Sequence, residues 1–379
     1  MPKKLWEPSK GLIKNSNLFA YEKFISKYYK YNLSRNYTKL LKWSVKNPKD
    51  FWNSIWKYFE VIGIKTNKFK LTKDLINSKF FVNSKLNFTE NLLVKNSNQK
   101  AITFVSENGY REQKSWKELN TDVKKIISFY KKISISKNDR IAAYTPNQIE
   151  TVECFLSASA IGSIWSSCSP DFGVPGVIER FSQIKPKLLI ITDKYYYNGK
   201  EINIIERLPK ILKKIKSIKS VLILNYPGKK LRKLKKIKNI KIYYFNEIKK
   251  YEISRNKLKK FDFDHELAIL YSSGTTGKPK CICHRSGGVL LQHLKEHQLH
   301  CNIKPNDNVF YFTTCGWMMW NWLVTALASK ASILLFDGFP MHKSPDLLLK
   351  IANKEKVTLF GISAKYIDQL IKQNVKVKE

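Results

Sequence analysis

Apolar residues alternate along most of the chain between helical spacing and short continuous runs. Ser115 and Glu118 form a capping box, and the apolar positions after it fall on one helical face. Further along, strands are predicted at 140–144, 163–166, 187–192, 266–271, 308–312, 332–336 and 357–361, and helices at 149–161, 174–184, 288–301, 321–329 and 345–352. Short apolar strands between longer amphipathic helices predict an α/β fold with mostly parallel sheets flanked by helices.

The first 95 residues lack this alternation and are rich in aromatic side chains at helical spacing. We therefore predict two parts, a helical entry segment over residues 1–95 and an α/β domain over residues 96–379. The apolar fraction of 43% excludes a disordered chain. No apolar run approaches the roughly 20 residues that a membrane span needs. Six cysteines at irregular spacing indicate a reducing compartment, so a cytoplasmic protein without a membrane partner is predicted.

The formal net charge of +39 raises the possibility of nucleic-acid binding. The lysines, however, occur in almost every segment together with Asn and Ile, a pattern typical of an A+T-rich genome. Residues 210–260 carry the densest charge, and we interpret them as a solvated face or loop rather than as an RNA-binding surface. RNA binding stays as an alternative function, and it would weaken steeply with salt.

A loop rich in hydroxyls and glycines follows the predicted strand 266–271. Residues 270–280 read Leu-Tyr-Ser-Ser-Gly-Thr-Thr-Gly-Lys-Pro-Lys. Glycines allow backbone N–H groups to converge on an anion, and the hydroxyls and lysines supply further donors. The spacing differs from that of the Walker loop. By composition alone the segment could equally be a solvated turn; its predicted phosphate-binding residues are Ser272, Ser273, Gly274, Thr275, Thr276, Gly277, Lys278 and Lys280.

Cysteine and histidine residues cluster after this loop, at positions 281, 283, 284, 293, 297, 300 and 301. His293 and His297 are four residues apart and would share a helical face. The cluster nevertheless lacks the paired spacing of structural zinc sites, and the same helix carries an ordinary apolar stripe. We predict no structural metal.

The loop sequence resembles the signature of the adenylate-forming superfamily, which includes acyl-CoA synthetases. Residues 308–322 (Asn-Val-Phe-Tyr-Phe-Thr-Thr-Cys-Gly-Trp-Met-Met-Trp-Asn-Trp) and 165–173 (Trp-Ser-Ser-Cys-Ser-Pro-Asp-Phe-Gly) are similar to the acetoacetyl-CoA synthetases within it. The segments at 5–9, 43–45, 50–52 and 86–93 are similar to the entry segment of acetyl- and acetoacetyl-CoA synthetases. The likeness is colinear over nearly the whole chain.

This resemblance implies an acid-thiol ligase that uses ATP, Mg²⁺ and CoA. A carboxylate, here acetoacetate, attacks the α-phosphate of ATP to give acyl-AMP and pyrophosphate, and the CoA thiol then displaces AMP. It implies that Thr275, Thr276 and Lys278 stabilise the reacting phosphate. It places the acyl pocket at His284, Gly316, Trp317, Met318 and Met319, and CoA contacts at Ser169, Asp171, Phe172, Tyr197 and Lys200.

Two alternatives stay open at these positions. The Trp and Met residues from 317 to 322 could instead be core side chains, and Tyr197 stands where acetyl-CoA synthetases carry arginine. The resemblance also implies a longer domain and a small C-terminal domain with a catalytic lysine, neither of which we can place. We therefore expect an N-terminal fragment that does not complete the reaction alone and has a possible partner chain for the rest, or a non-catalytic nucleotide-binding remnant.

Overall fold

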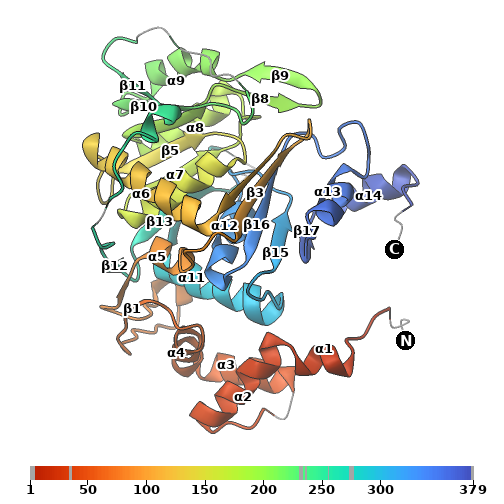
Figure 1. Ribbon diagram of the computed structural model, residues 1–379. Coiled ribbons are helices and arrows are strands. Elements are labelled where there is room, and N and C mark those ends of the chain that lie inside the picture. The colour runs from red at the N-terminus through yellow and green to blue at the C-terminus, as the bar shows by residue number, and fades with distance from the viewer. Residues whose placement is uncertain are drawn as a thin grey trace.

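Two mainly parallel sheets form the body of the protein (Figure 1). The computed structural model describes residues 5–33, 36–229, 234, 237–254, 256–272 and 277–376. The larger sheet has the strand order β11-β10-β7-β5-β6-β13-β14, and the smaller one has the order β17-β15-β16-β3-β4. Among these strands β14 and β4 pair antiparallel with their neighbours, and the other pairs are parallel. The predicted α/β fold with mostly parallel sheets is confirmed.

The strands of the larger sheet are β5 (Arg140–Tyr144), β6 (Ile164–Cys168), β7 (Leu188–Thr192), β10 (Ser220–Leu224), β11 (Lys241–Tyr244), β13 (Glu266–Tyr271) and β14 (Cys281–Arg285). Those of the smaller sheet are β3 (Lys100–Ser106), β4 (Arg111–Ser115), β15 (Asn308–Tyr311), β16 (Ser332–Asp337) and β17 (Leu359–Gly361). A separate hairpin is formed by β8 (Lys194–Tyr197) and β9 (Lys200–Asn203).

Helices cover both faces of the larger sheet because its strands are apolar on both sides. In β5, Ile141 and Ala143 join the core shared with α6 (Trp116–Lys132) and α7 (Ile149–Ala160). The alternate residues Ala142 and Tyr144 pack in the core of α8 (Val174–Ile184) and α9 (Leu208–Lys214). This two-residue alternation is the geometry of a strand buried on both faces. Helices α6 and α7 thereby lie between the two sheets (Figure 1).

The capping box at the start of α6 is confirmed. The Ser115 hydroxyl accepts from the N–H of Glu118, and the Glu118 carboxylate accepts from the N–H of Ser115 at 2.8 Å. The remaining helical elements are α10 (Phe245–Ile248), α11 (Ser286–Lys295), η3 (Glu296–His300), α12 (Met318–Thr325), α13 (Leu347–Lys354), α14 (Ala364–Lys372) and the short turns η1 (Leu75–Asn77), η2 (Ile205–Arg207) and η4 (Ala326–Ser329).

The sequence analysis predicted seven of the strands and missed the others, of which β14 and β10 are the most informative. Strand β14 is exposed along most of its length, so it carries no apolar pattern and is held by backbone pairing with β13. Because β14 runs to Arg285, α11 begins at Ser286, and its last turn from Glu296 is π-helical. Strand β10 lies inside the lysine-rich stretch 210–260, and all five of its residues are buried. The interpretation of that stretch as a solvated face or loop was therefore wrong for β10.

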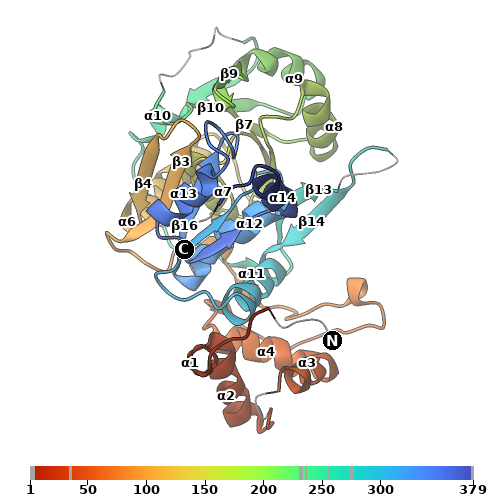
Figure 2. The ribbon, with the colours of Figure 1, turned by 90° about the vertical axis from the view of Figure 1, so that its right-hand side faces the viewer.

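Four helices of the N-terminal segment lie beneath α11 (Figure 2). They are α1 (Lys10–Lys14), α2 (Asn17–Tyr29), α3 (Tyr37–Lys46) and α4 (Pro48–Tyr58), and α4 contacts α11 directly. The backbone N–H of Asn17 donates to the side-chain oxygen of Asn302 at 2.8 Å, and the side-chain amide of Asn17 donates to the carbonyl of Ile303 at 2.9 Å. The N-terminal segment thus supports α11 from below; a domain boundary at residue 95 stays a prediction.

The connection between the two parts is built from short elements that carry a cluster of aromatic rings. Strands β1 (Gly63–Ile64), β2 (Lys85–Leu86) and β12 (Phe261–Asp262) form a three-stranded sheet. Helix α5 (Phe88–Leu92) follows β2 in the chain. The rings of Trp56 and Phe81 lie 4.9 Å apart, and the Phe263 ring lies 4.9 Å from Phe81. Aromatic rings at this separation attract one another, and this attraction adds to the stabilisation from the apolar area that they bury.

Candidate functional site

The predicted phosphate loop joins β13 to β14. Its base is closed by a hydrogen bond from the N–H of Ser272 to the carbonyl of Lys280, at 3.1 Å. Gly277 has φ of 149°, a conformation that favours glycine. The side chains of Lys278 and Lys280 are exposed. Four predicted residues, Ser273, Gly274, Thr275 and Thr276, lie outside the described residues.

The exit of the loop is tied to the neighbouring helix α8. The side-chain amide of Gln183 donates to the carbonyl of Pro279 at 3.0 Å, and Pro279 itself is buried. Lys278 is therefore carried on a segment whose two ends are anchored by hydrogen bonds. A phosphate bound at this loop would lie beyond the carboxyl end of β13, where ligands bind in parallel α/β sheets.

The segment between β15 and α12 is fixed against the ends of β5 and β6. The hydroxyl of Ser167 donates to the carbonyl of Cys315 at 2.6 Å, and the thiol of Cys315 donates to the carbonyl of Thr145 at 2.9 Å. Gly316 follows, and a Cβ there would lie 3.4 Å from the backbone nitrogen of Ser169. The structure thus brings Gly316, predicted for the acyl pocket, against Ser169, predicted for CoA binding.

The predicted CoA-contact loop at residues 169–172 is held by an arginine that the sequence analysis did not identify. Arg207 Nη1 donates to the carbonyls of Pro170 and Phe172, at 3.1 and 3.0 Å, and to the hydroxyl of Tyr144. The side chain of Asp171 is exposed on this loop. Arg207 thereby binds two carbonyls of this loop and ties them to Tyr144 at the end of β5.

Tyr197 and Lys200 lie on the β8–β9 hairpin, which a buried carboxylate fastens to the body. Glu107 accepts from the backbone N–H groups of Asn198, Gly199 and Phe339, at 2.8, 2.7 and 2.7 Å. Burial, and then the charge of Asp171, raise the pKa of Tyr197 above its usual value. Tyr197 therefore lies within electrostatic reach of the loop that carries Asp171; the assignment of these residues to CoA stays a prediction.

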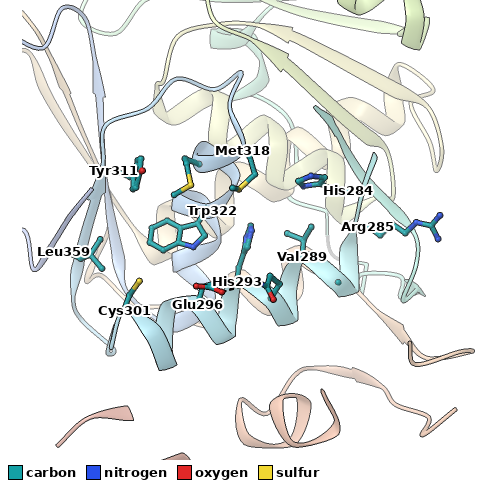
Figure 3. A pocket seen from close by; sticks show the side chains of 13 residues that line it. His284, Arg285, Val289, His293, Glu296, Cys301, Tyr311, Met318, Trp322 and Leu359 are labelled. Carbon is teal, nitrogen blue, oxygen red and sulfur yellow. Dashed lines mark hydrogen bonds between the residues drawn. The ribbon is translucent and has the colours of Figure 1, made fainter. Parts of the chain in front are cut away.

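A groove of about 870 Å³ opens between α11, α12 and the smaller sheet (Figure 3). Among the residues predicted for the acyl pocket, His284, Met318 and Met319 line it. Gly316 and Trp317 do not, and Trp317 is 53% exposed. Trp320 is fully buried, as the core interpretation requires. The run of large residues is thus divided between core and groove. The full lining is His284, Arg285, Gly288, Val289, Gln292, His293, Glu296, Cys301, Tyr311, Met318, Met319, Trp322 and Leu359.

The floor of the groove was missed by the sequence analysis, although its signal was present. Val289, Gln292, His293 and Glu296 recur at spacings of three and four, so they share one face of α11. His293 was considered only as a metal candidate. Among the described residues no group of three or more His, Cys, Asp or Glu is arranged to hold a metal ion. No helix in the described part of the chain is long and apolar enough to cross a membrane.

Asp337, at the end of β16, is a buried carboxyl near the hairpin anchor. The hydroxyl of Tyr226 donates to it at 3.1 Å, but burial raises its pKa to about 7. In the unfolded chain an Asp titrates near its ordinary value, so between about pH 4 and 7 the folded state holds a proton that the unfolded state has released. The stability that the protonated Asp337 contributes to the folded state is therefore lost as the pH rises through that window.

We expect Asp337→Asn to flatten the pH dependence of unfolding between about pH 4 and 7. The amide cannot ionise, so the free energy of unfolding should fall less steeply with pH than in the unmodified protein, by at least about 1 kcal/mol over the window. Urea unfolding at several pH values measures this difference. The control Asp368→Asn alters an exposed carboxyl of α14; an equal change in both variants would contradict the assignment to Asp337.

The two mostly parallel sheets and the Ser/Thr/Gly-rich sequence after β13 agree with the class of AMP-binding enzymes. The chain belongs to the family of AMP-binding enzymes, whose model matches residues 91–379. Within that family the chain is similar to acetoacetyl-CoA synthetases. It is 38% identical to the acetoacetyl-CoA synthetase of Gallus gallus over 90% of this chain and 52% of the relative. It is 37% identical to the acetoacetyl-coenzyme A synthetase of Rhizobium meliloti over 97% of this chain and 56% of the relative.

A solved structure agrees with these relatives. The acetoacetyl-CoA synthetase from Streptomyces lividans superposes with a TM-score of 0.91 and 29% sequence identity, covering 99% of this chain and 57% of that chain. The resemblance to acetoacetyl-CoA synthetases inferred from the sequence is confirmed. The chain spans about half the length of the relatives it matches.

Proposed function

We propose that this chain forms the ATP-binding and acid-binding part of an acetoacetate-CoA ligase. The observation that carries the proposal is the groove beside α12, because His284, Met318 and Met319, which were predicted for the acyl pocket, line one cavity together. The similarity to acetoacetyl-CoA synthetases over nearly the whole chain supports the same substrate. The proposed cellular setting is the cytoplasm.

In this proposal the loop after β13 binds the phosphates of ATP. Thr275, Thr276 and Lys278 stabilise charge on the α-phosphate while the acetoacetate carboxylate attacks it. Mg²⁺ bound with ATP would supply further positive charge beside the phosphates. Ser272, Ser273, Gly274, Gly277 and Lys280 complete the loop. Gly316 and Trp317 form the entrance to the acyl pocket.

The CoA thiol then attacks the acyl carbon and AMP leaves. We assign the approach of CoA to Ser169, Asp171, Phe172, Tyr197 and Lys200. The support is spatial: Ser169 lies against Gly316, which was predicted for the acyl pocket, and Arg207 holds the loop of residues 169–172 in place. A partner that supplies the part of the relatives not spanned here, in the same or a separate polypeptide, belongs to the proposal.

The test is reconstitution with the missing part of a relative. The 379-residue chain is co-expressed with the part of the Rhizobium meliloti relative that it does not span, and that relative divided at the same point is the control. We expect pyrophosphate release that depends on acetoacetate, followed by acetoacetyl-CoA formation. The proposal would be contradicted if the divided relative were active and the reconstituted chain neither bound ATP nor activated acetoacetate. The chain assayed by itself tests the expectation that it does not complete the reaction.

A further inference from the structure

A cavity of about 350 Å³ lies at the edge of the larger sheet opposite to the predicted phosphate loop. Its wall includes Ile135, Ile161 and Phe261, which precede β5, β6 and β13 in the chain. These three strands are parallel, so the residues before them meet at the edge formed by their amino ends. The predicted phosphate loop instead follows the carboxyl end of β13. The cavity and the loop are therefore separate sites.

Apolar side chains form the inner wall of the cavity. Ile127 of α6, Ile135 of the turn after it and Ala160 of α7 are buried there. Leu258 and Phe261 are half-buried and cover this wall from the segment that runs into β12. The volume lies at the lower end of the range of about 300–1,000 Å³ that is typical of small-molecule sites. An alkyl chain bound here would be removed from water, which is favourable for each methylene group buried.

The covering segment is held in place by hydrogen bonds. The buried side-chain amide of Asn87 donates to the carbonyl of Lys259 at 2.8 Å and to the carbonyl of Ala160 at 2.9 Å. The ammonium group of Lys131 donates to the hydroxyl of Ser254 at 3.3 Å. The segment is thus attached to α6 and to the end of α7, so the cavity beneath it is a fixed feature of the fold.

Lysine is the one charged residue type among the described residues that line the cavity, at positions 131, 137, 257 and 259. By contrast, Glu296 lines the groove, and the cavities beside β4, α5 and α13 each include at least one carboxylate. Within the described part of the chain, none of the four lysines forms an ion pair. The Nζ atom of Lys137 lies 5.8 Å from the centroid of the Phe261 ring, so its charge lies beside the apolar wall.

The abundance of lysine in this chain does not explain this arrangement. Lysines near the end of a helix offset the negative partial charge there, which accounts for Lys131 in the last turn of α6. Lys257 and Lys259 lie outside any helix. Like charges around an apolar hollow repel one another, and a bound anion removes this repulsion. The carboxyl ends of α6 and α7 favour a singly charged anion over a doubly charged one.

We propose that this cavity binds a medium-chain carboxylate, with its alkyl chain against Ile127, Ile135 and Ala160 and its carboxylate among the lysines. The cavity is separate from the groove and from the phosphate loop, so the inference does not rest on the proposed function. Because its wall joins α6, the end of α7 and the segment before β12, a bound carboxylate stabilises the folded state.

Methyl NMR of the 379-residue chain, with labelled isoleucine, locates the site. Ile127, Ile135 and Ile161 line the cavity, whereas the described lining of the groove contains no isoleucine. We expect octanoate to shift these three resonances, assigned with Ile→Val variants, until they saturate. Octanoate should bind about tenfold more tightly than hexanoate, since each buried methylene adds about threefold to fourfold. Unshifted resonances at these residues, or displacement of octanoate by ATP, would overturn the inference.

Two further probes test the charge of the ligand. Octanol has the same chain without the charge and should bind at least about fivefold more weakly than octanoate. Octyl phosphate should bind no more tightly than octanoate, because the helix ends disfavour a second negative charge. An affinity of octanol equal to that of octanoate, or tighter binding of octyl phosphate, would contradict the assignment to a carboxylate.

A double variant tests the lysines. Lys137→Gln combined with Lys257→Gln removes two exposed charges and retains the apolar wall. We expect octanoate to bind about fivefold to tenfold more weakly, and octanol to bind unchanged. The matched control, Lys46→Gln with Lys365→Gln, removes the same charge from exposed positions of α3 and α14 and should not alter octanoate binding. Equal losses in both double variants would mean that the net charge of the chain attracts octanoate, and the inference would be wrong.

Discussion

Lys278→Ala is expected to lower the rate of acyl-adenylate formation by about 100- to 1,000-fold, the usual effect of removing one charge-stabilising donor from an active site. The lysine ammonium is a compact point charge suited to phosphate oxygens. Lys278 is exposed and lies on a loop whose ends are pinned by Ser272 and Gln183, so alanine removes the charge and leaves the loop anchored. Pyrophosphate release by the reconstituted enzyme measures the effect.

Lys280→Ala is the matched control for this prediction. Lys280 is exposed on the same loop, and its structural contact is made by its backbone carbonyl, which alanine retains. Both variants should unfold at nearly the same urea concentration as the unmodified chain, because exposed substitutions change stability by less than about 0.5 kcal/mol. Unchanged pyrophosphate release in Lys278→Ala would remove Lys278 from the mechanism, and a loss in Lys280→Ala as large as that in Lys278→Ala would show that the two lysines contribute equally.

Gly287→Ala is expected to lower the free energy of unfolding by about 1–3 kcal/mol, as overpacking of a closed site does. A Cβ at Gly287 would lie 2.2 Å from the Phe263 ring. The ring cannot withdraw easily, because it packs against Phe81 and Trp56. The backbone N–H of Gly287 also donates to the carbonyl of Phe263 at 2.9 Å, so helix and ring are held together. Urea unfolding of the 379-residue chain measures the loss.

The neighbouring glycine provides the control. A Cβ at Gly288 would meet no atom within 4 Å. Since glycine inside a helix is less favourable than alanine, Gly288→Ala should leave stability unchanged or raise it by up to about 1 kcal/mol. Equal destabilisation in both variants would mean that α11 is weakened by the added methyl group itself. The destabilisation of Gly287→Ala would then not be caused by the contact with Phe263 or by a change in how the N-terminal segment supports α11.

The buried strands and amphipathic helices were predictable because their pattern of apolar residues is local. Strand β5 and helix α8 were predicted at their observed bounds, and the capping box of Ser115 and Glu118 marked the start of α6. Strand β14 was not predictable in this way. It lies at the edge of its sheet, so its residues face solvent and its strand geometry comes from pairing with β13.

The candidate site was predictable to the extent that its residues form a sequence motif. A phosphate loop at residues 272–280 and an acyl pocket at residues 316–319 could be predicted because their signatures are contiguous, and both stay predictions. Arg207 could not be found in this way, because it acts on a loop 35 residues away in sequence through backbone carbonyls. Carbonyls are present at every residue, so nothing in the sequence of that loop identifies its partner.

By itself the sequence determined the class of fold and the likeness to acetoacetyl-CoA synthetases and predicted a phosphate loop, because each depends on residue types at fixed local spacing. The tertiary structure decided which large side chains are core and which line the groove, so that Trp320 is buried whereas Met318 faces the cavity. It also placed His293 of α11 beside Thr325 of α12, with 3.0 Å between the ring Nδ1 and the hydroxyl oxygen. A side chain's burial and hydrogen-bond partners depend on residues distant in sequence, and folding alone brings these together.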